Sequence, residues 1–89
     1  MNMEKKILEI LRTVLEMPTI DETCSQQNCD NWDSLHHLNL IIELQMEFDI
    51  SLEPEEIAEM HSYEDVVKMV KSKLTIMIIL KNIRNRISF

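Results

Sequence analysis

Apolar residues at the start of the chain recur at the spacing of one helix face. Between residues 3 and 16 these positions are Ile7, Leu11, Val14 and Leu15, and this spacing predicts an amphipathic helix. Pro18 follows closely and favours the end of that helix. Residues 17–33 are polar and show no period, so we expect a long loop there.

The stretch from about residue 34 to 48 carries two apolar stripes on one predicted helix. With about 100° per residue, the first stripe comprises Leu40, Ile41, Leu44 and Phe48. The second stripe, nearly opposite, comprises Leu35, Leu38, Ile42 and Met46. A polar flank between them holds His36, Asn39, Glu43 and Glu47. One stripe faces the core, and the other is either part of a wide buried arc or an exposed binding surface.

Two further helices are predicted after residue 53. Pro54 is suited to a first helical position, and acids follow it in the first turn, so a short helix is expected over about 54–60. The sequence SYED at 62–65 matches a capping box and opens a helix to about Leu74. Its expected core face is Val66, Val67, Val70 and Leu74. The pattern predicts an all-α four-helix bundle with a long first loop and a short third helix.

Composition and charge narrow the range of functions. The chain has no glycine, whereas phosphate-binding loops, dinucleotide-binding turns and nucleophile elbows need glycine where the backbone turns sharply. Residues 13–67 contain fourteen acidic side chains and no lysine or arginine, and residues 66–89 contain six basic side chains and no acid. An acidic body repels nucleic acid and anionic membranes and attracts partners with basic surfaces, unless the acids only solvate the surface.

Cys24 and Cys29 form a C-x4-C pair. The charged, amphipathic N-terminal sequence does not resemble a signal peptide, so two reduced thiols in a cytoplasmic protein are expected. A zinc site with His36 and His37 is an alternative, although this spacing matches no familiar finger. The longest uninterrupted apolar run, IMIIL at 76–80, is too short to cross a membrane.

Ser34 lies at the junction of the long loop and the second helix, where three roles are open. As a helix cap, its replacement by alanine would cost about 0.5–2 kcal/mol. As a nucleophile beside Asp33 and the two histidines, it would still lack an oriented base and an oxyanion hole, so we expect no enzyme. As an attachment point, its hydroxyl would be exposed, and the helix N-terminus would favour a phosphate ester there.

The run DSLHHLNLIIELQMEFDISLEPEEIAEM, followed by SYEDVVKMVKSKL, resembles the acyl carrier protein family. The resemblance covers about residues 3–74 and rests on DSL in register with the four-helix pattern. It implies that Ser34 receives 4′-phosphopantetheine from coenzyme A through a separate magnesium-dependent transferase. The prosthetic thiol would then carry an acyl or aminoacyl group as a thioester between biosynthetic enzymes.

The resemblance also implies a partner-docking face along the helix after the serine. The matching positions here are Asp33, Leu35, Leu38, Ile42, Glu43, Met46 and Glu47. Shelter for the cargo is expected between the second and third helices. Trp32 stands close to where carriers of fatty acid synthesis usually have glycine. A W-D-S-L start is more similar to specialised carriers, and we expect Trp32 to anchor the loop.

The segment 75–89 lies outside the family pattern and is treated as a basic, amphipathic C-terminal extension of a carrier domain formed by residues 1–74. Its apolar stripe is Ile76, Ile79, Leu80, Ile83 and Ile87. A longer last helix, an additional helix and a strand are all compatible with this pattern. The stripe would pack on the acidic body or on a second copy, or it would contact a membrane or a partner.

The leading hypothesis is therefore a carrier protein whose partners are the transferase and acyl- or aminoacyl-activating enzymes with basic docking surfaces. The runner-up is an acidic helical adaptor that binds basic protein surfaces and leaves Ser34 unmodified. A metal-binding regulator that uses Cys24, Cys29 and the histidines is the third hypothesis.

Overall fold

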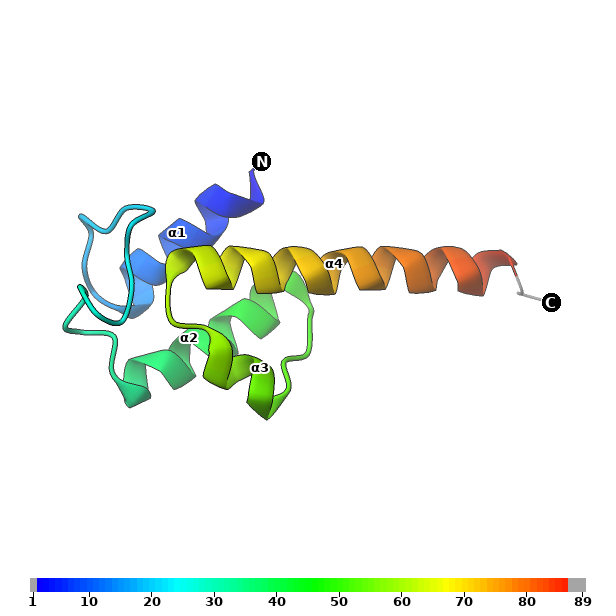
Figure 1. The fold of residues 1–89 in the computed structure, drawn as a ribbon. Helices are drawn as coiled ribbons and strands as arrows, with labels where there is room; N and C mark the ends of the chain where they lie inside the picture. The colour runs from blue at the N-terminus through cyan, green and yellow to red at the C-terminus, as the bar shows by residue number, and fades with distance from the viewer. Residues whose placement is uncertain (1, 87–89) are drawn as a thin grey trace.

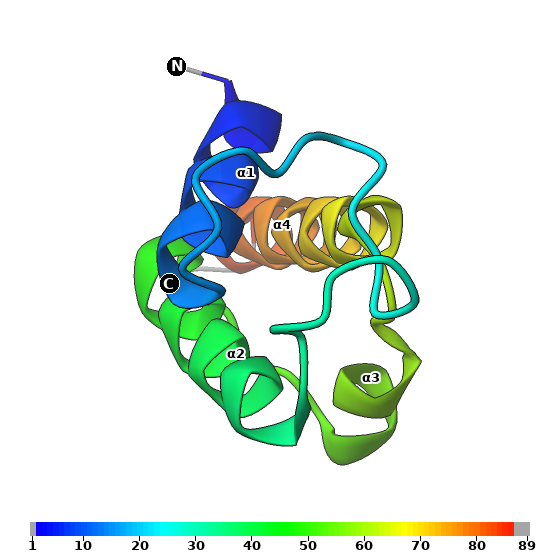
Figure 2. The same ribbon diagram turned by 90° about the vertical axis from the view of Figure 1, so that its left-hand side faces the viewer.

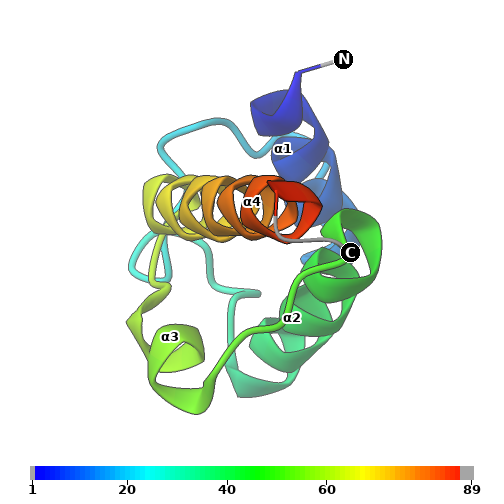
Figure 3. The same ribbon diagram turned by 90° about the vertical axis from the view of Figure 1, so that its right-hand side faces the viewer.

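The computed structural model describes residues 2–86 and contains four helices: α1 Met3–Val14, α2 Ser34–Phe48, α3 Pro54–Glu59 and α4 Tyr63–Arg86. In Figure 1, α4 is the longest helix and extends from the bundle to the C-terminal end, with α1 on one side of it and α2 and α3 on the other. Views along α4 show α1, α2 and α3 arranged around its first half (Figures 2 and 3). The predicted all-α bundle with a long first loop and a short third helix is confirmed.

One apolar core joins α1, α2 and α4. α1 contributes Ile7 and Leu11, α2 contributes Leu40, Ile41 and Leu44, and α4 contributes Val66, Val67 and Val70. The first stripe of α2 is therefore the core stripe. Val14, Phe48 and Leu74 are only partly buried, since each lies near an end of the three-helix contact. The second stripe of α2 is exposed, which excludes the wide buried arc.

The loop between α1 and α2 folds over the core. Ile20, Cys24, Cys29 and Trp32 are buried in it. Two side chains tie it to α1, because Arg12 Nε donates to the Ile20 carbonyl at 2.8 Å and Asn31 Nδ2 donates to the Leu15 carbonyl at 2.7 Å. The predicted anchoring role of Trp32 is confirmed by its burial.

Two left-handed residues end helices without the aid of glycine. Glu16 has φ 56° and Asp49 has φ 52°. The Asp49 amide donates to the Gln45 carbonyl and closes α2, and the Gln45 side chain accepts from the Leu52 amide at 2.9 Å. Aspartate tolerates this conformation, whereas glutamate adopts it less readily. The left-handed turn at Glu16 also explains why α1 ends at Val14 and not at the predicted residue 16.

The starts of α3 and α4 follow the sequence signals closely. Pro54 is the first residue of α3, and the Glu53 amide donates to the Glu56 carboxylate at 2.8 Å. At α4 the Asp65 amide donates to Ser62 Oγ at 3.1 Å, as the capping box requires. The Asp65 carboxylate accepts from the His61 amide at 3.0 Å, so the reciprocal bond forms one residue earlier than in the standard motif.

Residues 75–86 continue α4 without interruption, so the extension is a longer last helix. In Figure 1 this second half of α4 projects beyond the other helices. Packing of the extension on its own acidic body is therefore not observed, although Met77 still contacts the core. Ile87 lies outside the described residues, and the proposed boundary between residues 74 and 75 stays a prediction. Within residues 2–86, no helix combines the length and the apolar character needed to cross a membrane.

Two leucines of α2 provide a matched test of its orientation. Leu44 is fully buried, whereas Leu38 is 56% exposed. We expect Leu44→Ala to lower the free energy of unfolding by about 2–5 kcal/mol, because it leaves a cavity between three helices. Leu38→Ala is expected to change it by less than about 0.5 kcal/mol. Urea denaturation followed by circular dichroism measures both, and equal losses would contradict this orientation of α2.

Candidate functional site

Ser34 is the first residue of α2 and is exposed. Asp33 precedes it in an extended conformation, and its Oδ1 accepts from the His36 amide at 2.9 Å. Asp33 is thus the N-cap of the helix. The expectation that Ser34 caps α2 is wrong, because the register places serine inside the first turn and aspartate at the cap. The Ser34 hydroxyl therefore has no capping role, so its removal should cost much less than the loss of a cap.

His36 lies beside Ser34 in a small cluster of acids. Its Nδ1 is 2.7 Å from Asp33 Oδ1, and its Nε2 is 3.6 Å from a Glu16 carboxylate oxygen. The hydrogen bond with Asp33 raises the pKa of His36 above its usual value. The amide and ring of His36 lower the pKa of Asp33. The cluster thus places a carboxylate with a lowered pKa and an imidazole with a raised pKa next to the serine.

His37 links three segments of the fold. Its Nδ1 accepts from Trp32 Nε1 at 2.9 Å, and its Nε2 donates to the Ile57 carbonyl at 2.8 Å. The indole and imidazole rings are also stacked, with centroids 6.2 Å apart. Both ring nitrogens are therefore used, and His37 is unavailable as a base for Ser34. The link joins the loop, α2 and α3 at the end of the bundle where Ser34 lies.

The second stripe of α2 forms an apolar surface that begins one residue after Ser34. Its members are Leu35, Leu38, Ile42 and Met46, which are 65%, 56%, 52% and 73% exposed. Glu43 and Glu47 lie on one flank of this surface and are also exposed. We refer to these six residues as the α2 face.

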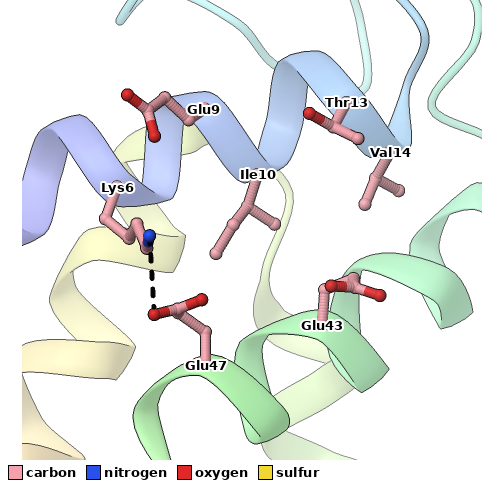
Figure 4. A pocket seen from close by; sticks show the side chains of 7 residues that line it. All are labelled: Lys6, Glu9, Ile10, Thr13, Val14, Glu43 and Glu47. Carbon is pink, nitrogen blue, oxygen red and sulfur yellow. Dashed lines mark ion pairs between the residues drawn. The ribbon is translucent and has the colours of Figure 1, made fainter.

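A pocket of about 170 Å³ lies between α1 and α2. Figure 4 shows Ile10 and Val14 extending from α1 toward α2, with Glu43 and Glu47 opposite them. Lys6 reaches across this pocket to Glu47, with Nζ and Oε2 3.6 Å apart. Lys6 thus partly neutralises Glu47, whereas no ion pair with Glu43 is found among residues 2–86. Ser34 does not line this pocket, and shelter of cargo between α2 and α3 stays a prediction.

Cys24 and Cys29 are free thiols whose Sγ atoms are 2.7 Å apart. Burial, with a contribution from the hydrogen bond to Cys29, raises the pKa of Cys24 to about 12. Cys24 therefore stays protonated near neutral pH and is a poor metal ligand. Among residues 2–86, no three histidine, cysteine or acidic side chains cluster in a way that could hold a metal ion. The zinc site considered from the sequence is not formed.

Sequence reasoning missed the connection of Trp32 through His37 to the Ile57 carbonyl. The residues are five and twenty positions apart, and no helical period links a loop tryptophan to a backbone oxygen of α3. A tryptophan five residues before a histidine, across a helix start, was the available signal. This spacing alone does not predict a contact between the two rings, because the contact depends on how the loop folds over the core.

Solved structures of two acyl carrier proteins share this fold. The holo acyl carrier protein from Geobacter metallireducens has a TM-score of 0.76 and 28% identity, over 88% of this chain and 92% of that chain. The acyl carrier protein from Thermotoga maritima has a TM-score of 0.67 and 26% identity, over 85% of this chain and 96% of that chain. No protein-family model and no curated protein sequence matches the chain. The resemblance inferred from DSL and the helix pattern is confirmed by the three-dimensional comparison.

The contact between His36 and Asp33 predicts a pH dependence near Ser34. We expect His36 to titrate above its usual pKa, and Asp33→Asn to move the pKa of His36 back down. The raised pKa of the folded state stabilises the protein fully below the unfolded value of 6.5, and this contribution is lost as the pH rises through the folded value. Histidine NMR titration measures the shift, with the exposed loop substitution Asp30→Asn as control. A pKa of His36 that does not respond to Asp33→Asn would contradict the assignment.

Proposed function

Since this chain belongs to the acyl carrier protein family, we propose that it carries acyl or aminoacyl groups on 4′-phosphopantetheine attached to Ser34. The exposed Ser34 hydroxyl in the first turn of α2 is the single observation that carries this assignment. It is a carrier and not a catalyst. Free buried thiols and an acidic body are compatible with a cytoplasmic role beside biosynthetic enzymes.

The environment of Ser34 fits a prosthetic group that is added by another protein. The hydroxyl is exposed, and the cap is supplied by Asp33, so esterification of Ser34 leaves the capping bond of α2 intact. A phosphodiester on Ser34 also lies at the positive end of a fifteen-residue helix, where negative charge is stabilised. When bound, phosphopantetheine supplies a terminal thiol that holds the cargo as a thioester.

Attachment requires an external base and metal, which the transferase provides. The Ser34 oxygen forms a bond to the phosphorus of coenzyme A that bears the pantetheine, and the bond from that phosphorus to the adenosine bisphosphate breaks. The Ser34 proton leaves to the transferase or to solvent. The chain itself holds Ser34 at a rigid helix start, because Trp32 and His37 fix the preceding loop against α2 and α3. This rigidity presents the hydroxyl in one orientation to the transferase.

The α2 face supports docking of the transferase and of the loading enzymes. It combines an apolar stripe with Glu43 and Glu47, and Asp33 lies at its serine end. A basic, partly apolar surface on an enzyme matches this chemistry. A tethered cargo reaches a high local concentration at each enzyme even when docking is weak. The class of cargo, acyl or aminoacyl, is set by the enzyme that loads the thiol.

Modification at Ser34 is tested by intact mass spectrometry. The chain is incubated with coenzyme A, Mg²⁺ and a broad-specificity phosphopantetheinyl transferase, and it should gain one phosphopantetheinyl group. Ser34→Ala should gain none. Its free energy of unfolding should differ from that of the wild type by less than about 0.5 kcal/mol, because Asp33 still caps α2. No gain in a folded wild-type sample, with a positive-control carrier modified alongside, would favour the acidic adaptor.

Docking along α2 is tested by charge reversal. We expect Glu43→Lys to lower the rate of modification at limiting transferase by about tenfold, because it places a cation against a basic partner. Glu47→Lys should have a smaller effect, since Lys6 already neutralises part of that charge. Glu22→Lys is the matched control, because Glu22 is exposed but lies beside Tyr63 and the start of α1. Equal rates for Glu43→Lys and Glu22→Lys would argue against the α2 face.

A further inference from the structure

The second half of α4 exposes a large apolar stripe with no partner in the described part of the chain. Ile76, Ile79 and Ile83 are each 50% exposed, and Leu80 is 58% exposed. We refer to these four residues as the α4 stripe. They lie on the part of α4 that projects away from the bundle (Figure 1). An exposed, contiguous apolar surface of this kind usually marks an interaction site.

The α4 stripe does not continue the side of α4 that packs in the core. At about 100° per residue, Ile76, Ile79 and Ile83 centre about 120° around the helix from Val66 and Val70. The core-facing direction continues instead through Met77, which still contacts the core, and then through the exposed Lys81. A straight α4 therefore cannot turn the α4 stripe onto its own bundle.

The charges beside the α4 stripe indicate what its occupant must carry. Arg84 is exposed and lies along one edge of the stripe, whereas Lys68 and Lys73, one to two turns before the stripe, already pair with Glu64 and Glu56. Residues 66–89 contain six basic side chains and no acid. Direct pairing of two extensions would bring like charges together, whereas an apolar surface with acidic flanks would attract them.

The α2 face of the same protein has this complementary chemistry. Its four apolar side chains are exposed, Glu43 lies on one flank, and the acidic helix α3 with exposed Glu55 and Glu59 lies on the other side. From Leu35 to Met46 the face is about 16 Å long, and from Ile76 to Ile83 the α4 stripe is about 10 Å long. The stripe is thus short enough to lie along the face.

We propose that the α4 stripe of one copy docks on the α2 face of a second copy, so that the chain self-associates through an apolar contact flanked by opposite charges. Each copy docks its α4 stripe on the α2 face of the other, which gives a closed dimer with two-fold symmetry. Ser34 is not part of the α4 stripe or of the α2 face, so the proposed self-association does not depend on the proposed modification. It does cover the surface proposed for enzymes, and self-association therefore competes with docking.

Sedimentation equilibrium of the full chain tests the proposal. The average mass should rise above the 10.6 kDa of the monomer with increasing concentration, and high salt should weaken the association. Ile76→Asp should weaken it at least tenfold. Ile78→Asp is the matched control, because Ile78 is 61% exposed on the same helix but points away from the α4 stripe, and it should change the association less than twofold. A wild-type chain that stays monomeric at several hundred micromolar would overturn the proposal.

A mixing experiment identifies which surfaces meet. Ile42→Asp should weaken self-association as Ile76→Asp does, and circular dichroism should show both variants folded, since both side chains are exposed. A mixture of the two should associate better than either alone, because one copy supplies an intact α4 stripe and the other an intact α2 face. Association that Ile76→Asp abolishes and Ile42→Asp leaves unchanged would indicate stripe-to-stripe pairing and overturn the proposal. Ser34→Ala should associate like the wild type, which separates this test from that of the carrier function.

Discussion

Burial of the α2 stripe formed by Leu40, Ile41 and Leu44 is the constraint on which the other features depend. These side chains pack against α1 and α4 with almost no exposed surface, and their contact sets the rotation of α2 about its own axis. Because a helix is rigid, this rotation places Leu35, Leu38, Ile42 and Met46 in solvent. It also directs the first turn of α2, with Ser34, away from the core. The exposure of the proposed carrier site and of the proposed docking face thus both follow from one packing contact.

The absence of glycine shapes how the long loop reaches Ser34. The loop leaves α1 through a left-handed turn at Glu16, and hydrogen bonds from the Arg12 and Asn31 side chains hold it against α1. Trp32 fills the core beneath the loop, and His37 receives its indole N–H while donating to α3. Since His37 is committed to this structural link, it cannot also serve chemistry at the serine. In the proposed carrier role, activation of the Ser34 hydroxyl is therefore left to the transferase.

The division of charge separates the molecule into an acidic bundle and a basic extension. Within the bundle, Lys6, Lys71 and Lys73 pair with Glu47, Glu4 and Glu56, so the first half of α4 and α1 balance part of the acidic charge. Glu43 remains available on the α2 face. Beyond residue 75, the basic residues lie among exposed isoleucines that do not pack on the bundle. The same acidic, apolar face thus suits an enzyme with a basic surface and the extension of a neighbouring copy.

The helices, their approximate starts, the DSL junction and the uneven charge follow from the sequence alone, because helical period, proline, capping residues and ionisable groups act over one or two turns. The sequence left open which stripe of α2 is buried, it misplaced the N-cap, and it did not reveal the contacts of His37. These features depend on contacts between residues far apart in the chain, such as His37 with Ile57 and Trp32 with the core. The direction of the extension was also undetermined, since its stripe lies about 120° from the core face of the same helix. Local periodicity determined the elements, and only tertiary packing decided which faces remained free for function.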